Sequence, residues 1–192
     1  MILQKILNKL RPIYHYLLAL CGALIYRFPA RKIFVVAITG TKGKSTTSEL
    51  INSVLEEAGF ATALANTLRF KIADNSKRNL LKMTMPGRFF LQKFLREAVN
   101  AGMQYAIIEM TSEGARQFRH KFIDLDALVV TNISPEHIES HGSYEKIFGC
   151  QTKHCESFIK IKKGRRILIV NADDAEADKF LSIPHVEKLT YK

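Results

Sequence analysis

An apolar run that ends in a glycine-rich turn and continues into a helix constrains this sequence most. Residues 33–39 (IFVVAIT) are apolar and mostly β-branched, residues 40–44 (GTKGK) follow, and residues 45–58 carry apolar side chains at helical spacing. A continuous apolar run of this length is typical of a strand buried on both faces of a parallel sheet. The order strand, tight turn and helix therefore predicts an α/β fold.

The same alternation continues to the last residues. Strands are expected at 33–39, 60–65, 105–110, 127–131, 166–171 and 186–191, and helices at 45–58, 88–100 and 143–160, with a polar loop or hairpin at 66–81. The residues expected to face inward are Leu50, Ile51, Val54, Leu55 and Ala58 in the first of these helices, and Phe90, Phe94, Leu95 and Ala98 in the second. We predict an open, mostly parallel sheet with helices on both faces, and ligands at the carboxyl ends of its strands.

Charge and cysteine content narrow the class of protein. The chain has 29 Lys and Arg against 18 Asp and Glu, a net charge of +11 and 47% hydrophobic residues, which excludes a disordered chain. A basic chain favours an anionic partner, but charge alone leaves nucleic acid, a membrane surface and a polyphosphate ligand open. Cys21, Cys150 and Cys155 do not have the spacing of a zinc site, and they predict a reduced, cytosolic protein.

The first 32 residues are basic and apolar, and we expect them to form an N-terminal helix. They contain six basic residues and no acidic one. Residues 12–28 (PIYHYLLALCGALIYRF) are at the lower length limit for a membrane span, and His15 and Arg27 weaken that interpretation. Two alternatives remain: a helix that covers the domain, which we favour, and a helix that lies on an anionic membrane surface.

The glycine-rich turn has the composition of a phosphate-binding loop. Backbone N–H groups at a helix N-terminus form an anion site, to which Lys44 adds a positive charge and Ser45 a hydroxyl for Mg²⁺. The spacing is G-x-x-G-K-S, which is shorter than the common G-x-x-x-x-G-K-[ST] pattern. Ile38 occupies the position of the first glycine in that common pattern. The strand before it and the helix after it favour nucleotide phosphate binding over a chance turn.

Two strand ends carry side chains suited to a metal ion. Glu109 stands at the end of one apolar strand, and carboxylate oxygens are ligands that Mg²⁺ prefers. The next strand leads into residues 131–142 (TNISPEHIESHG), where His137 and His141 stand beside carboxylates. A solvated loop is the alternative interpretation of both segments.

The sequence resembles a known family of enzymes. The run ITGTKGKSTTSEL is similar to the nucleotide loop of the Mur ligases, ATP-dependent amide ligases of peptidoglycan precursor synthesis. Within that family, later stretches have the order and spacing of the MurE type, which joins a diamino acid or lysine to UDP-MurNAc-L-Ala-D-Glu: TMPGRFFLQKFLREAVNAG, EMTSEGARQFR, TNISPEHIESHG and VNADD. The resemblance covers residues 33–192. MurF-type ligases share the nucleotide loop and a similar TNI…H segment, whereas Gln117 and Arg119 match MurE better.

The resemblance implies roles for particular residues. The loop that would hold the ATP phosphates consists of Gly40, Thr41, Lys42, Gly43, Lys44, Ser45 and Thr46, with Lys44 on the transferred phosphate. Glu109 and His137 match the magnesium ligands of the family. Lys153, ahead of Lys146 and Lys160, matches its carbamylated lysine, whose carbamate would hold a second magnesium ion. The residues that match its muramyl-peptide contacts are Thr84, Pro86, Thr111, Gln117 and Arg119, with Met85 in place of the second Thr of the family's Thr-Thr-Pro segment.

The resemblance also implies a reaction. ATP, with Mg²⁺, would phosphorylate the terminal carboxylate of a UDP-muramyl peptide, and the amine of an amino acid would displace the phosphate. Nucleic acid has no place in this chemistry. The protein would be cytoplasmic, at the inner face of the membrane if residues 12–28 contact lipid.

Two regions of the family are missing from this sequence: the domain that binds the uridine nucleotide and the domain that binds the incoming amino acid. We therefore expect an N-terminal helix (1–32) and a truncated central ATP-binding domain (33–192), which alone would not form an amide bond. A fragment of a MurE-type ligase is the favoured interpretation. The alternatives are a MurF-type fragment and a short non-catalytic protein that binds nucleotide or membrane.

Overall fold

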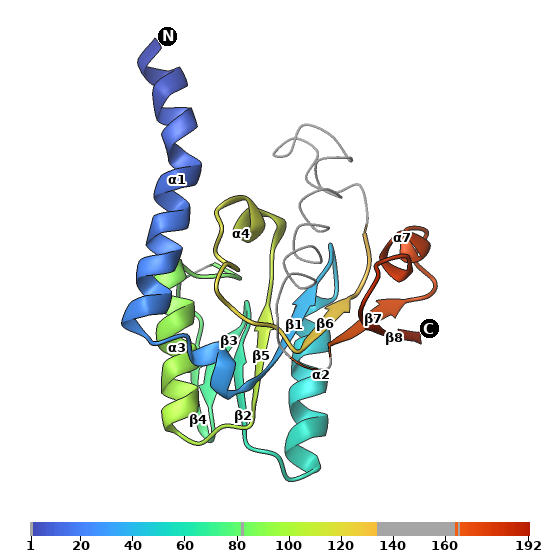
Figure 1. Ribbon diagram of the computed structural model, residues 1–192. Helices are drawn as coiled ribbons and strands as arrows, with labels where there is room; N and C mark the ends of the chain where they lie inside the picture. The colour runs from blue at the N-terminus through green and yellow to red at the C-terminus, as the bar shows by residue number, and fades with distance from the viewer. Residues whose placement is uncertain (1, 82, 134–163, 165) are drawn as a thin grey trace.

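The computed structural model describes residues 2–81, 83–133, 164 and 166–192, in which helices and strands alternate (Figure 1). The helices are α1 (Ile2–Ile25), the 3₁₀ helix η1 (Pro29–Lys32), α2 (Lys44–Glu57), α3 (Arg88–Asn100), α4 (Ser112–Arg116) and α7 (Ala177–Leu181). The strands are β1 (Phe34–Thr39), β2 (Thr62–Ala65), β3 (Arg69–Ile72), β4 (Asn75–Arg78), β5 (Tyr105–Glu109), β6 (Ala127–Val130), β7 (Ile167–Asn171) and β8 (Glu187–Tyr191).

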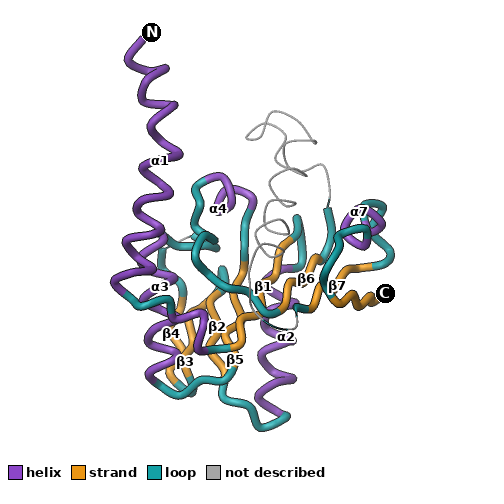
Figure 2. Tube along the Cα trace, viewed as in Figure 1, coloured by secondary structure: helices purple, strands orange, loops and turns teal. Residues whose placement is uncertain are grey.

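The described strands form one sheet in the order β4-β3-β2-β5-β1-β6-β7-β8 (Figure 2). The pairs from β2 to β8 are parallel, while β3 pairs antiparallel with both β2 and β4. In the centre, Val36 of β1 lies opposite Ile107 of β5 and Ala127 of β6. The predicted open, mostly parallel α/β sheet is confirmed, and the carboxyl ends of β1, β5 and β6 meet at one edge.

Alternate residues of the central strands face two separate cores. Val35 of β1 lies in the core beneath α3 together with Leu95, whereas Val36 lies in the core against which Leu55 of α2 packs. Leu95 is fully buried, and burial of a leucine side chain stabilises the fold by about 1.5–3 kcal/mol. Helices on both faces thus fix the sheet whose edge carries the predicted site.

The face of α2 that lies on the sheet differs from the predicted one. Ser48 and Asn52 are buried, and each has a hydrogen-bond partner, which offsets the cost of burying a polar group. A pattern that counts only apolar residues cannot detect a buried face of this kind. The prediction was wrong for three residues, which are exposed: Leu50, Val54 and Ala58.

α1 packs small residues against α3. Ala19 and Ala23 are buried, and an ideal β-carbon at Gly22 would lie 3.6 Å from the α3 backbone. Arg96 of α3 donates to the carbonyl oxygen of Tyr26, just past the end of α1, at 2.8 Å. The C-terminal half of α1 therefore packs on α3, as a helix that covers the domain would.

The opposite face of α1 is apolar and exposed. Leu10, Ile13, Leu17 and Leu24 recur at helical spacing, and each is more than half exposed. The N-terminal half of α1 extends beyond α3 (Figure 1). In the described part of the chain, no helix is long and apolar enough to cross a membrane.

Several element boundaries differ from the predicted ones. Residues 69–78 form the β3–β4 hairpin, one of the two forms predicted for residues 66–81. α1 contains Pro12 and ends at Ile25, before the end of the N-terminal helix predicted at 1–32. The short helices α4 and α7 were not predicted. The predicted helix at 143–160 lies outside the described residues.

Candidate functional site

The turn between β1 and α2 places a helix N-terminus at the carboxyl ends of the central strands. Gly40 and Gly43 have φ angles of 140° and 77°, which other residues rarely adopt. Gly43 is the N-cap of α2, a helix of 14 residues with no acidic side chain in its first turn. The first N–H groups of α2 and the positive end of its dipole therefore lie at this turn. Such an arrangement suits a phosphate group.

The end of β6 holds the turn from the other side. The N–H of Thr41 donates to the carbonyl oxygen of Asn132, and the N–H of Lys42 donates to Asn132 Oδ1, both at 2.9 Å. Thr131 Oγ1 donates to the carbonyl oxygen of Lys42 at 2.8 Å. Two strand ends thus fix the conformation of the turn.

Lys44 reaches back over the turn from the first position of α2. Its Nζ donates to the carbonyl oxygens of Gly40 at 2.7 Å and Thr41 at 2.9 Å. The ammonium charge is therefore held beside the N-terminus of α2, where it can form charge-assisted hydrogen bonds with a phosphate. Ser45 and Thr46 place their hydroxyls in the same first turn of the helix.

Glu109, the last residue of β5, is a buried carboxylate with 1% exposure. Its Oε2 accepts from Thr67 Oγ1 at 2.8 Å, and its Oε1 lies 3.3 Å from Ser48 Oγ. Among the described residues these partners are neutral hydroxyls, which offset only part of the cost of burying a charge. An oxygen donor with this surrounding fits a divalent cation such as Mg²⁺.

The first predicted substrate residue lies next to this carboxylate. Thr84 Oγ1 lies 2.9 Å from Thr67 Oγ1. Because the single hydroxyl proton of Thr67 goes to Glu109, the Thr84 hydroxyl is the donor in this pair. Thr84, Thr67 and Glu109 therefore form one hydrogen-bonded chain.

The other predicted substrate residues form a second group. Arg119 donates to the carbonyl oxygen of Met85 and, at 2.8 Å, to Gln117 Oε1. Pro86 is buried. Thr111 is the N-cap of α4, and its hydroxyl accepts from Gly114 N–H at 3.0 Å. The structure thus joins Gln117, Arg119 and the 84–86 segment, while Thr111 has a structural role in α4.

The guanidinium groups of Arg88 and Arg119 both contact Gln117. Arg88 Nη2 lies 2.6 Å from His15 Nδ1 and donates at the same distance to the carbonyl oxygen of Gln117. Burial lowers the pKa of Arg88, and the neighbouring Arg119 guanidinium lowers it further. Burial and then the charges of Arg88, Arg11 and Arg119 lower the pKa of His15. Since a guanidinium only donates, His15 Nδ1 accepts, and the imidazole is neutral.

Sequence reasoning missed several polar residues around Glu109. Thr67 and Ser48 contact the carboxylate, and Asn66 Nδ2 donates to Ser48 Oγ at 3.2 Å. Arg69 donates to both oxygens of Glu49 at 2.9 and 2.5 Å, which joins the β3–β4 hairpin to α2. The S-x-x-S spacing within the phosphate turn and α2 was the available signal for Ser48.

Two predicted site residues, His137 and Lys153, lie outside the described part of the chain, as do Cys150 and Cys155, for which no site was predicted. Within the described residues, no group of three or more His, Cys, Asp or Glu side chains is arranged to hold a metal ion. Cys21 is a free, exposed thiol on α1.

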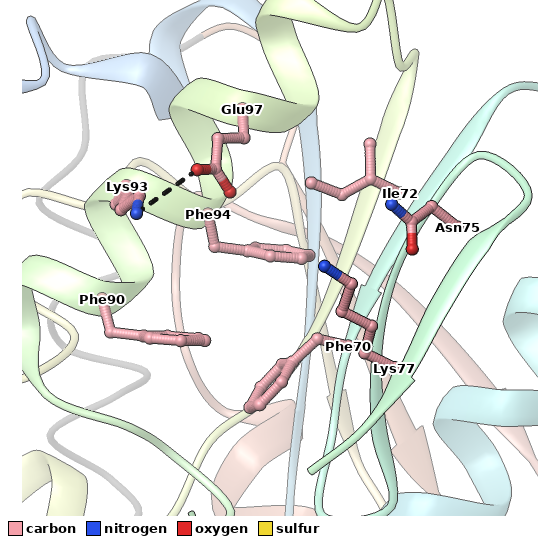
Figure 3. Close-up of a pocket in the computed structure, with 8 residues that line it drawn as sticks. All are labelled: Phe70, Ile72, Asn75, Lys77, Phe90, Lys93, Phe94 and Glu97. Carbon is pink, nitrogen blue, oxygen red and sulfur yellow. Dashed lines mark ion pairs between the residues drawn. The ribbon is translucent and has the colours of Figure 1, made fainter.

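An apolar cavity lies at the edge of the sheet that carries the hairpin (Figure 3). It measures about 270 Å³, and Phe70 of β3 faces Phe90 and Phe94 of α3, with ring centroids 4.7 and 6.4 Å away. Lys77 also lines it. Its lining includes no predicted site residue, so it reflects packing between the hairpin and α3.

The sheet order and the glycine turn between β1 and α2 define an α/β domain of the P-loop type. Residues 38–192 match the family described as "Mur ligase middle domain". This match covers most of the chain, and the protein belongs to the Mur ligase family.

Known proteins agree with this assignment. The chain is 35% identical over 184 residues to a "UDP-N-acetylmuramyl-tripeptide synthetase" of Roseiflexus sp. (strain RS-1), covering 91% of this chain and 36% of that protein. A solved UDP-N-acetylmuramoyl-L-alanyl-D-glutamate--2,6-diaminopimelate ligase has a TM-score of 0.75 and 26% identity, covering 88% of this chain and 35% of the other. Mycobacterium tuberculosis folylpolyglutamate synthase complexed with ADP shares the fold, with a TM-score of 0.67, 13% identity and coverage of 90% and 45%. The chain spans about a third of the two Mur relatives.

Proposed function

We propose that this chain provides the ATP-binding part of a MurE-type ligase, which joins an amino acid to UDP-MurNAc-L-Ala-D-Glu. The observation that carries the proposal is the meeting of two groups at adjacent strand ends. The phosphate turn follows β1, and Glu109, opposite Ile38 of β1, connects through Thr67 to Thr84. Residues 33–192 are then the central domain of the ligase, and residues 1–32 precede it as a helix.

The positions of the side chains support distinct roles. The N-terminus of α2 and Lys44 bind the γ-phosphate of ATP and neutralise charge as the phosphoryl group transfers. Ser45, Glu109 and His137 would hold one Mg²⁺ ion, and carbamylated Lys153 would hold a second. His137 and Lys153 lie outside the described residues. When bound, Mg²⁺ adds electrostatic stabilisation of the phosphoryl oxygens.

The proposed reaction has two steps. A carboxylate oxygen of the acceptor attacks the γ-phosphorus of ATP, the bond to the ADP oxygen breaks, and an acyl phosphate forms. The nitrogen of the amino acid then attacks the acyl carbon, phosphate leaves, and the new amide nitrogen loses a proton. Arg119 donates to Gln117 and to the 84–86 segment, and its guanidinium would bind a carboxylate of the acceptor.

Two measurements test this function. Calorimetry of the 192-residue chain should show Mg²⁺-dependent ATP binding. Mass spectrometry of reactions with UDP-MurNAc-L-Ala-D-Glu, ATP and either diaminopimelate or lysine, run on the longest natural protein that contains this chain, then identifies the amino acid. If no product forms with either amine, the MurE-type assignment is wrong. Formation of a product from a UDP-muramyl tripeptide and D-Ala-D-Ala would favour a MurF type.

A second candidate function rests on the exposed stripe of α1. Leu10, Ile13, Leu17 and Leu24 form a continuous apolar face opposite the one that packs on α3. The first 32 residues carry six basic side chains and no acidic one. An apolar helix face with basic residues around it suits the surface of an anionic membrane. We propose that α1 makes a peripheral contact with such a surface.

A further inference from the structure

A cavity of about 350 Å³ lies between α1 and α4. Its lining comes from Arg11, Pro12 and His15 on one side and from Glu113, Arg116 and Gln117 on the other. Gln117 is the one residue of this set that matched a substrate contact. The cavity therefore brings the N-terminal helix to the group of residues that includes Arg119.

Cationic groups outnumber acidic ones at this cavity. Arg11 and Arg116 line it, while Arg88 and Arg119 lie behind it and donate to carbonyl oxygens, which carry no charge. Among the described residues that line it, Glu113 is the one carboxylate, and it lies 3.3 Å from Arg116 Nη1. In the described part of the chain, two guanidinium groups and one carboxylate thus line the cavity, and two further guanidinium groups contact Gln117 of its lining.

Contacts within the wall fix the protonation of His15. Its Nδ1 accepts from Arg88, so Nε2 carries the ring proton and is a donor. The pKa values of His15 and Arg88 are both lowered by burial and by neighbouring guanidinium charge. An anion in the cavity would relieve this repulsion, because it would add the missing negative charge.

We propose that the cavity between α1 and α4 binds a phosphate or carboxylate group of an anionic ligand, with Arg11 and Arg116 as its principal donors. Guanidinium groups match the planar geometry of both anions through paired N–H donors. The inference deepens the proposed function and rests on it in one respect. In a ligase for a muramyl nucleotide, the anion is the diphosphate or a peptide carboxylate of the acceptor, and α1 forms part of the acceptor site.

Histidine ring NMR signals of the wild-type chain test this proposal, with pyrophosphate and glutarate as probes. The sequence has six histidines, and the signal missing from a His15→Gln variant identifies His15. We expect a saturable shift of the His15 signal with at least one probe. A response to pyrophosphate assigns the site to a diphosphate, and a response to glutarate assigns it to a carboxylate. No shift of His15 with either probe at millimolar concentration overturns the proposal.

Two variants separate specific binding from general attraction. Arg11→Gln/Arg116→Gln removes the exposed donors of the cavity and should weaken probe binding at least about tenfold. Arg27→Gln removes one charge of the same N-terminal segment outside the lining and should leave probe affinity unchanged. Equal weakening in both overturns the proposal. ATP affinity, measured on the wild type and the same variants, separates the cavity proposal from the proposed function. If ATP binds but the His15 signal does not respond to either probe, only the cavity proposal is rejected. If the wild type shows no Mg²⁺-dependent ATP binding, the proposed function is rejected.

Discussion

Gly40 and Thr131 approach so closely that an ideal β-carbon on Gly40 would lie 2.0 Å from Thr131 Oγ1. The two residues stand at the ends of the neighbouring strands β1 and β6, so this approach seats the phosphate turn on the sheet. The carbonyl oxygen of Asn132 would lie 2.9 Å from the same β-carbon. Only glycine fits at this position without displacing the end of β6.

Gly40→Ala should therefore destabilise the protein by about 2–4 kcal/mol, through backbone strain and overpacking together. Urea unfolding followed by circular dichroism measures the change. Gly87→Ala is the matched control, because Gly87 has an ordinary φ of −57° and an ideal β-carbon there would have no atom within 4 Å beyond its chain neighbours. Equal losses in the two variants would contradict the steric explanation.

Lys44→Ala should weaken ATP binding by one to two orders of magnitude, because a charge-assisted contact is worth about 1.5–3 kcal/mol. Isothermal titration calorimetry gives the two affinities. Lys32→Ala removes an equal charge from the exposed end of η1 and should bind ATP as the wild type does. Unchanged affinity in Lys44→Ala would reject the phosphate-loop interpretation.

Glu109→Gln should reduce the Mg²⁺ dependence of ATP binding and leave the fold intact. Glutamine retains an oxygen that can accept from Thr67, but it lacks the charge that a divalent cation requires. ATP titrations with and without Mg²⁺ measure the effect, with exposed Glu113→Gln as the control. If Mg²⁺ enhances ATP binding equally in wild type and Glu109→Gln, Glu109 is not a metal ligand.

Glu49→Gln should cost about 0.5–1 kcal/mol at neutral pH, because Glu49 and Arg69 form a partly buried ion pair. The hydrogen bond from Arg69 is the main cause that lowers the pKa of Glu49 below its ordinary value of 4.5. A depressed carboxyl pKa stabilises the fold above that ordinary value, and this contribution disappears as pH falls through the folded pKa.

Unfolding free energies of wild type and Glu49→Gln should therefore converge below pH 4.5. Glu97→Gln, which breaks an exposed pair with Lys93, serves as the control and should change stability little. If the free energies of unfolding of wild type and Glu49→Gln differ by the same amount in acid and at neutral pH, the ion pair is not the source of the difference.

Leu17→Glu should abolish binding to anionic vesicles if the exposed face of α1 contacts membrane, since burying a leucine contributes about 1.5–3 kcal/mol. High salt should weaken the binding of the wild type, because basic residues contribute to it. Co-sedimentation measures both effects. Leu50→Glu changes an exposed leucine of α2 and is the matched control. If Leu17→Glu and the wild type bind the vesicles equally, the exposed face of α1 does not contact membrane, and α1 only covers the domain.

The sheet could be predicted from sequence because its central strands are buried on both faces and read as unbroken apolar runs. The phosphate turn could be predicted because its function depends on local chemistry: two glycines, a lysine and a serine between a strand and a helix. Both features are encoded within short windows of sequence.

The surroundings of Glu109 depend on residues far apart in the chain. Thr67 stands 42 residues before Glu109, in a polar segment that gave no periodic signal. The cavity at α4 likewise depends on where α1 lies against the domain, and no local pattern links His15 to Arg88 across 73 residues. Such tertiary contacts require the folded arrangement, so sequence patterns could not supply them.

The position of β1 between β5 and β6 has a consequence for the order of folding. The N–H of Lys42 and Oδ1 of Asn132 are 90 residues apart in sequence, and closing so long a loop costs entropy before any contact can offset it. We therefore expect the phosphate turn to reach its final conformation late, after β6 has joined β1. A nascent chain should be unable to retain a nucleotide until Asn132 has left the ribosome.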